Sequence, residues 1–263
     1  MGIHRLSLKM PPSYSGAMLR EAIGRKLGLK DFSYEIEKKS LDARKKSNIH
    51  WLINVQVYSP ASSQAGFAAS PPALVIPYRG TGKKVLVCGS GPAGFFAAWV
   101  LQQAGFQTTI IERGAEVENR AGGISKFEKH AVFSETANYA FGEGGAGTFS
   151  DGKLTSRSKH ISREKDYILH AYIRAGAPEE IAWLAHPHLG TDTLRRVVKS
   201  LRMAYLEAGG SILFETRLLG IESEKGRVKA FLTDAGDLTA DYFFLCTGDS
   251  AFDTYRMLMQ AGL

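Results

Sequence analysis

Three glycines have the spacing that a nucleotide-binding turn requires. Gly89, Gly91 and Gly94 lie in the stretch CGSGPAG, between the apolar run KKVLVCG and the helical pattern SGPAGFFAAWVLQQAG. The first glycine permits a tight turn, the second lets the backbone approach a pyrophosphate, and the third lets the helix pack closely on the strand. Phosphates would then lie at the positive end of the helix, among N–H groups that have no helical partner.

An acidic residue follows at the distance that a dinucleotide-binding unit requires. Glu112 ends the next apolar run, FQTTIIER, and a carboxylate at that point can accept both hydroxyls of an adenosine ribose. A 2′-phosphate would instead favour a basic residue there. The alternative interpretation is an empty glycine turn with a solvated Glu112. The strand before the turn and the helix after it favour a bound dinucleotide, either NAD or FAD.

A second glycine-rich stretch, GEGGAGTFSDGKLTSR, occupies residues 142–157. Each glycine costs roughly 0.5–1 kcal/mol relative to alanine in a regular element, so the cluster needs a reason. A flexible linker is the simple alternative. The other interpretation is a loop whose backbone contacts the ribityl chain and ring of FAD. The residues that suit such a loop are Gly144, Gly145, Gly147 and Thr148.

Two later segments also favour FAD over NAD. SILFETRLLGIE predicts a strand after a long helix, and YFFLCTGDSA predicts an apolar strand that ends in Thr247 and Gly248. In flavoproteins with two dinucleotide-binding units, such a strand returns beside the first one and meets the cofactor through Thr-Gly. Upstream of these strands, PEEIAWLAH has helical spacing and predicts a short helix.

Composition excludes several classes of protein. The 263 residues are 44% hydrophobic and 22% charged, with no apolar run long enough for a membrane span and no secretory signal. Cys88 and Cys246 lie far apart inside apolar runs and form no CxxC pair, which predicts reduced core thiols in a cytoplasmic protein. His186 and His188 have no third ligand at a useful spacing, so we expect no metal site.

The basic residues are concentrated at the front of the chain. Residues 1–84 hold 14 of the 33 Lys and Arg residues but only 5 of the 26 Asp and Glu residues. This part shows a β-α-β-β pattern, followed by the Ser-, Pro- and Ala-rich stretch SPASSQAGFAASPPA. The predicted fold class is α/β. A small basic α+β (βαββ) domain at 1–58 and a linker at 59–82 precede an FAD-binding, Rossmann-like three-layer domain at 83–263.

Several of these segments together resemble a known family. VLVCGSGPAGFFAAWVLQQAGFQTTIIERG, FGEGGAGTFSDGKLT, PHLGTDTLRRVVKSLR and FLCTGDSAFDTYRMLMQAGL are similar to the largely uncharacterised FAD-dependent dehydrogenases of the glutathione-reductase-like fold. Members of that family also begin with a small domain that contains a segment like KKSLDARKK, here at 38–46. They are about twice as long as this chain, and they usually carry His where Asp249 stands here.

The resemblance implies a set of cofactor contacts. These are Gly89, Gly91, Pro92, Ala93 and Gly94 at the pyrophosphate; Glu112, Arg113 and the backbone of Leu218 at the adenosine; Gly145, Gly147 and Thr148 near the flavin; and Thr247 with Gly248 closing the site. Two weaker candidates for a catalytic role are Lys153 and His188. Lys153 or Arg157 either stabilises charge at the flavin or is solvated, and His188 either faces the flavin or is a structural loop residue.

The expected function is that of an FAD-dependent oxidoreductase, a dehydrogenase that holds FAD non-covalently. The expected partners are NAD(P)H as an electron donor and a small molecule or a redox protein as substrate. Two alternatives stay open. One is a non-catalytic FAD- or nucleotide-binding fragment, and the other is a flavoprotein that acts on RNA through the basic residues 1–60. If the glycine-rich loop contacts the flavin, Gly147→Val should weaken FAD binding.

Overall fold

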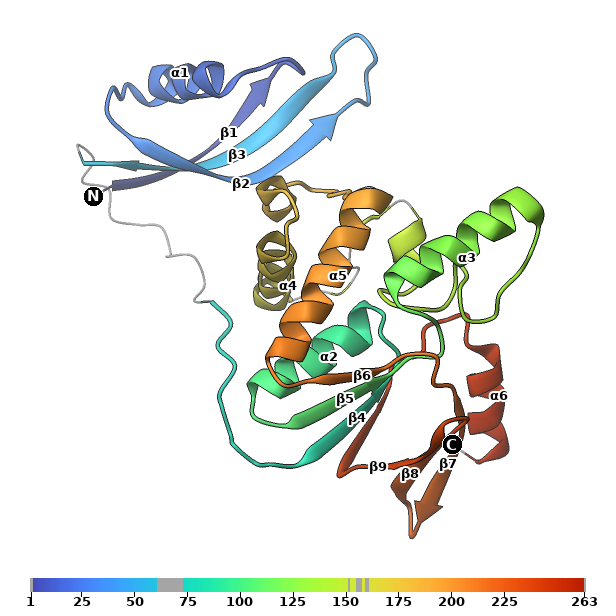
Figure 1. Ribbon diagram of the computed structural model, residues 1–263. Helices are drawn as coiled ribbons and strands as arrows, with labels where there is room; N and C mark the ends of the chain where they lie inside the picture. The colour runs from blue at the N-terminus through green and yellow to red at the C-terminus, as the bar shows by residue number, and fades with distance from the viewer. Residues whose placement is uncertain (1, 61–72, 151, 155–157, 159–160, 263) are drawn as a thin grey trace. The chain divides into compact units, whose positions relative to one another are not determined.

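The computed structural model describes residues 2–60, 73–150, 152–154, 158 and 161–262, which fold as two compact units (Figure 1). The first unit comprises Met1–Ala73, Leu154–Asp166 and Pro178–Pro187. The second comprises Leu74–Lys153, Tyr167–Ala177 and His188–Leu263. Residues 61–72 of the expected linker, and Arg157, lie outside the described residues.

The first unit contains the predicted β-α-β-β order. Its elements are β1 (Gly2–Met10), α1 (Gly16–Leu27), β2 (Ser33–Asp42) and β3 (His50–Ser59), and the antiparallel sheet has the order β1-β3-β2. Helix α1 begins where the Ser15 hydroxyl accepts the Met18 N–H, and it ends at Gly28, whose φ of 69° few other residues adopt. Leu19 and Ile23 of this helix are fully buried in the core that it shares with the sheet.

The segment PEEIAWLAH does not form the predicted helix. A single short 3₁₀ helix, η2 (Glu179–Ala182), is followed by a turn at Trp183 and an isolated bridge between Leu184 and Lys39. Lys39 of β2 donates its N–H to the Trp183 carbonyl at 2.8 Å, and Ala185 donates its N–H to the Lys39 carbonyl at 2.9 Å. The free edge of β2 thus provides backbone partners that a helix would not need, which overrides the helical spacing of the side chains.

The second unit is built on a parallel sheet with the order β10-β4-β5-β6. These strands are β4 (Lys84–Cys88), β5 (Gln107–Ile111), β6 (Ser211–Leu213) and β10 (Tyr242–Leu245). A smaller antiparallel sheet contains β7 (Leu218–Glu224), β8 (Arg227–Thr233) and β9 (Gly236–Thr239). The helices are α2 (Pro92–Gln103), α3 (Val117–His130), η1 (Ala146–Phe149), α4 (Ser162–Arg174), α5 (Thr191–Glu207) and α6 (Phe252–Gln260).

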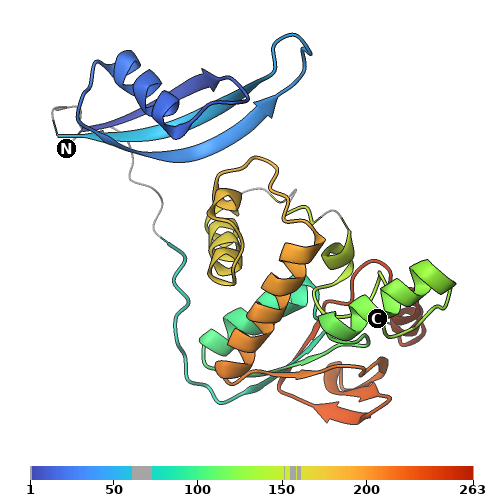
Figure 2. The ribbon, with the colours of Figure 1, turned by 45° about the horizontal axis from the view of Figure 1, so that its top comes forward.

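These elements form the predicted three layers. Helices α2 and α5 cover one face of the parallel sheet, and the β7–β9 sheet lies against the other (Figure 2). Tyr205 of α5 is fully buried and its hydroxyl lies 2.6 Å from the Thr108 hydroxyl of β5. Leu86 and Ile111 of the parallel sheet pack with Phe231 of β8. The fold class predicted from the sequence is therefore confirmed.

Every helix among the described residues is too short or too polar to span a lipid bilayer. The cytoplasmic location stays a prediction.

Candidate cofactor-binding site

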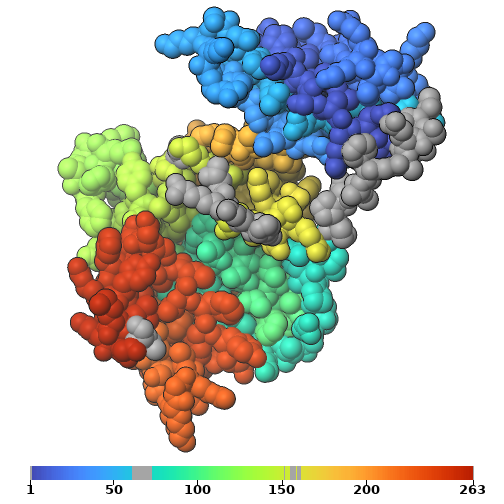
Figure 3. Space-filling view, turned by 180° about the vertical axis from the view of Figure 1, so that it is seen from behind, coloured from blue at the N-terminus to red at the C-terminus, as the bar shows by residue number. Residues whose placement is uncertain are grey.

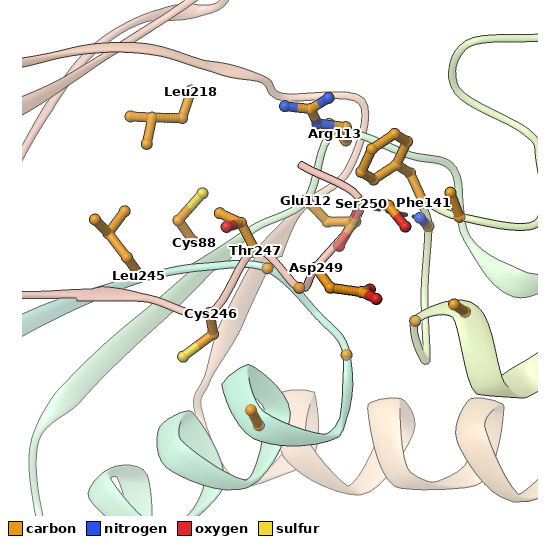
Figure 4. A pocket seen from close by; sticks show the side chains of 18 of the residues that line it. Cys88, Glu112, Arg113, Phe141, Leu218, Leu245, Cys246, Thr247, Asp249 and Ser250 are labelled. Carbon is orange, nitrogen blue, oxygen red and sulfur yellow. Dashed lines mark hydrogen bonds between the residues drawn. The ribbon is translucent and has the colours of Figure 1, made fainter. Parts of the chain in front are cut away.

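A cavity of about 380 Å³ opens where the carboxyl ends of β4, β5 and β10 meet. Its walls are the glycine turn after β4, the segment after β5, residues 140–146 and residues 245–250 (Figure 4). Open parallel sheets bind their ligands at this edge, outside the carboxyl ends of the strands. The fold therefore places the cavity where the sequence motifs predict a dinucleotide.

Most of the predicted cofactor contacts line this cavity. They are Gly89, Gly91, Pro92, Ala93, Glu112, Arg113, Gly145, Leu218, Thr247 and Gly248. Six predicted residues, all of them described, lie outside its lining: Gly94, Gly144, Gly147, Thr148, Lys153 and His188. The structure thus brings together residues from five separate segments of the chain.

The glycine turn needs its glycines because the backbone is crowded. Gly89 has a φ of 108°, and a Cβ on it would lie 2.3 Å from the carbonyl oxygen of Cys246. A Cβ on Gly94 would lie 1.9 Å from the carbonyl oxygen of Gly89. Gly94 thus lets α2 pack on the turn, as predicted, and has no need to touch a ligand. Gly91 faces the second glycine-rich loop, with its Cβ position 3.7 Å from the Cα of Gly145.

Glu112 makes contacts that the sequence did not predict. Its buried carboxylate accepts the N–H of Ser90 at 2.9 Å and the Ser90 hydroxyl at 2.8 Å. The other carboxylate oxygen accepts the N–H of Gly114 at 2.9 Å and that of Gly142 at 3.0 Å. A carboxylate has about four acceptor positions, so protein donors occupy all of them in this structure. Glu112 therefore links the glycine turn to the second loop through hydrogen bonds that need no bound ribose.

Arg113 forms the wall beside Glu112. Its guanidinium lies 4.3 Å from the centre of the Phe141 ring and donates to the Asp253 carboxylate at 2.8 Å. Arg217 donates to the same carboxylate at 2.6 Å. Partial burial alone would raise the pKa of Asp253, but the two arginines outweigh burial and lower the pKa to about 2. The ion cluster fixes Arg113 against α6, which lies beside the segment after α3 on one face of the unit (Figure 3).

The second glycine-rich loop meets the cavity at Gly145, not at Gly147. Gly145 has a φ of 72°, and a Cβ on it would lie 3.1 Å from the Cα of Gly91. A Cβ on Gly147 would meet no protein atom within 4 Å. Thr148 is buried under the loop, and a Cβ on Gly144 would lie 2.3 Å from the Thr148 hydroxyl. The Thr148 hydroxyl thus faces the loop backbone and does not line the cavity.

The two weaker catalytic candidates are neighbours. Lys153 and His188 pair across an isolated antiparallel bridge, and Leu189 donates its N–H to the Gly152 carbonyl at 3.2 Å. Residues paired in this way project their side chains to the same side of the ladder. Their catalytic role stays a proposal. Among the described residues, no three His, Cys, Asp or Glu side chains gather closely enough to hold a metal ion.

Sequence reasoning missed part of the lining. The additional residues are Cys88, Ala140, Phe141, Gly142, Ala146, Thr216, Leu245, Cys246, Asp249, Ser250, Tyr255 and Leu258. Most flank a recognised motif, so extending each motif by two residues would have found them. Tyr255 and Leu258 lie on α6, and only their helical spacing of three residues puts them on one face. Burial raises the pKa of the Cys88 thiol to about 12, so this thiol stays protonated at neutral pH.

Figure 4 shows how the lining is divided. Leu218, Leu245 and Cys88 form an apolar end, and Arg113 with Phe141 forms a second region. The Asp249 carboxylate extends between the glycine turn and the second loop. The cavity thus offers an apolar wall, a polar middle and a backbone-lined turn at the start of a helix.

The sequence matches two protein families. Residues 83–251 match a family described as FAD binding domain, and residues 2–58 match a domain of unknown function. An uncharacterized protein of Clostridium beijerinckii is 34% identical over an alignment of 255 residues that covers 92% of this chain and 48% of that protein. The chain therefore spans about half the length of this relative.

The chain is also similar to solved structures with which it shares little sequence. Thermovibrio ammonificans THI4 is 14% identical, with a TM-score of 0.43 over 69% of this chain and 63% of that one. Glycine oxidase from Bacillus cereus is 14% identical, with a TM-score of 0.36 over 68% of this chain and 58% of that one.

Proposed function

Because the chain belongs to the FAD binding domain family, we propose that it acts as an FAD-dependent oxidoreductase whose cofactor lies in the cavity of the second unit. The cavity itself supports this proposal. It joins a glycine turn at the start of α2 to a polar middle and an apolar end, which is the order of chemistry along the ADP half of FAD. FAD supplies the redox chemistry, while the protein binds, orients and shields it.

We assign a role to each part of the lining. The backbone at Gly91 and Ala93 would hold the pyrophosphate at the start of α2, which carries the positive end of the helix dipole. Leu218 and Leu245 would enclose the adenine. Arg113 would reach the adenosine from its place on the Phe141 ring. Asp249 adds a negative charge to the wall, which would disfavour an anionic reduced flavin beside it.

The identities of the substrate and the electron donor are proposed on grounds other than the cavity. We propose NAD(P)H as donor and a small molecule or a redox protein as substrate, in keeping with the sequence resemblance. We also propose the division into a small domain at 1–58, a linker at 59–82 and the FAD-binding domain at 83–263. The two family matches, at 2–58 and 83–251, support it. A non-catalytic FAD-binding fragment is the competing proposal.

Purified protein should be yellow and should release FAD when heated. The reason is that the cavity holds its ligand through backbone groups and packing, and the proposal includes no covalent bond to the cofactor. Chromatography of the heat-released nucleotide with mass detection distinguishes FAD from NAD. Anaerobic mixing with NADH or NADPH then tests the enzyme: bleaching of the flavin band supports the oxidoreductase, and a flavin that dithionite alone bleaches favours the non-catalytic fragment. Release of NAD alone would contradict the cofactor assignment.

The excess of basic residues in the N-terminal part of the chain leads to a separate prediction. Full-length protein should bind heparin or RNA at low salt and elute at moderate salt, because Lys and Arg release counterions from a polyanion. Lys45 and Lys46 are exposed, so replacing both by Gln should lower the salt concentration at elution. Failure to bind at low ionic strength would leave the basic residues as a solvated surface and would remove the RNA alternative.

A further inference from the structure

Among the residues that the structure describes, Arg120 is the largest fully buried side chain, and no recognised motif includes it. It lies in the first half of α3, outside the lining of the cavity. Burying a cation is expensive unless it is fully hydrogen-bonded. Burial lowers the pKa of Arg120 to about 10, against the attraction of Glu112 and Glu143, so the guanidinium stays charged at neutral pH.

The guanidinium of Arg120 donates hydrogen bonds to one segment, residues 138–145. Nε donates to the Asn138 carbonyl at 2.8 Å, and Nη2 donates to the Tyr139 carbonyl at 2.8 Å. Nη1 donates to the carbonyls of Glu143 at 2.8 Å and Gly145 at 2.7 Å. All these acceptors are backbone oxygens of residues 138–145, which precede and begin the second glycine-rich loop.

These bonds decide which way the loop presents its N–H groups. In a trans peptide the C=O and the following N–H point in opposite directions, and the described residues contain no cis peptide. With the Glu143 carbonyl turned to Arg120, the N–H of Gly144 faces the glycine turn and donates to the Ser90 carbonyl at 3.2 Å. With the Gly145 carbonyl turned to Arg120, the N–H of Ala146 points the other way, where Gly145 and Ala146 line the cavity.

Helix α3 also holds both sides of the loop. The Glu143 carboxylate accepts the N–H of Val117, in the first turn of α3, at 2.7 Å. The ring of Phe149, further along the loop, lies 4.8 Å from the Arg120 guanidinium and 5.7 Å from that of Arg195. Arg120 thus contacts backbone carbonyls from Asn138 to Gly145 and the aromatic ring of Phe149.

We propose that Arg120 is a positioning residue that pre-forms the glycine-rich loop, so that the N–H of Ala146 is aimed at FAD. This inference rests on the proposed function. A stretch so rich in glycine has many accessible backbone conformations, and ordering it on binding would weaken affinity. Arg120 orders it beforehand, through hydrogen bonds to its backbone carbonyls.

The variants Arg120→Lys and Arg120→Gln test the proposal. A lysine keeps the charge but has three donors at one point and cannot match a planar fork. We expect FAD affinity to fall at least roughly tenfold in both variants, because the loop must then be ordered on binding. Amide exchange should become faster in residues 138–149 and stay unchanged in β4 and β5. Lys126→Gln is the control, since Lys126 is an exposed cation on the same helix.

If Arg120 only stabilises the fold, its variants should give a different result. Variants with a lower melting temperature, uniformly faster exchange and unchanged FAD affinity would overturn the proposal. If both variants fail to fold, amide exchange of the FAD-free wild-type protein tests the proposal. Slow exchange at the amides of Gly144 and Gly145 supports a pre-formed loop, and exchange at the rate of an unstructured peptide overturns it. If the wild-type protein binds no FAD, the proposed function fails, while the exchange data still report on the loop.

Discussion

Replacing Glu112 by glutamine is expected to destabilise the protein even without FAD. The buried carboxylate accepts four donors, three of which are backbone N–H groups of Ser90, Gly114 and Gly142. A glutamine replaces one of its two oxygens by an NH₂ donor, so two of the four donors lose their acceptor. At about 1–3 kcal/mol for each buried unsatisfied group, the free energy of unfolding should fall by roughly 2–6 kcal/mol.

Urea denaturation of FAD-free protein measures this effect. Glu207→Gln is the matched control, because Glu207 is exposed at the end of α5, and its stability should stay within about 0.5 kcal/mol of the wild type. FAD affinity of Glu112→Gln should also fall, since the carboxylate joins the two loops that flank the cavity. A variant with wild-type stability that loses only FAD affinity would show that Glu112 serves the ribose alone.

Replacing Gly145 by valine should give the largest loss of FAD affinity of any change in the loop. The residue has a φ of 72°, and its Cβ would lie 3.1 Å from the Cα of Gly91. A branched side chain would push the loop away from the glycine turn and enter the cavity. We expect affinity to fall by more than about tenfold, which is about 1.4 kcal/mol. The positive φ should lower the free energy of unfolding by about 1–2 kcal/mol.

Gly147→Val is the control for this variant. The sequence predicts a loss of FAD affinity for it, but Gly147 lies outside the cavity lining and has space for a Cβ. We therefore expect its affinity to stay within a factor of about three of the wild type, as for other substitutions at open sites. Fluorescence titration of FAD with the two proteins makes the comparison. Equal affinities for Gly145→Val and the wild type would contradict the assigned loop, and a loss confined to Gly147→Val would restore the sequence-based expectation.

The sequence predicted the elements whose chemistry depends on the backbone. Gly89 and Gly94 mark a turn that nothing but glycine fits, and the apolar runs before and after it mark buried parallel strands. Such signals are local, so they can be recognised without the fold. The hydroxyl of Thr148 is different, because only the packed loop shows that it faces Gly144.

The contacts that hold the site could not be predicted because they join distant residues. An arginine in the pattern VENRAGG is typical of a solvated helix face, yet Arg120 is fully buried. Its acceptors are carbonyls, which every residue has, so no residue type in the loop marks them. Three of the four donors to Glu112 are likewise backbone groups. The helical spacing of PEEIAWLAH misled for a related reason, since the edge of β2 supplies its backbone partners.

The central claim is that FAD occupies the cavity at the carboxyl edge of the parallel sheet. Amide hydrogen exchange of the full chain, with and without saturating FAD, tests it most directly. We predict slower exchange in residues 89–94, 140–146 and 245–250, which line the cavity, and no change in β1 to β3. Slower exchange confined to residues 2–59, or no change in the three cavity segments when FAD is bound, would contradict the claim.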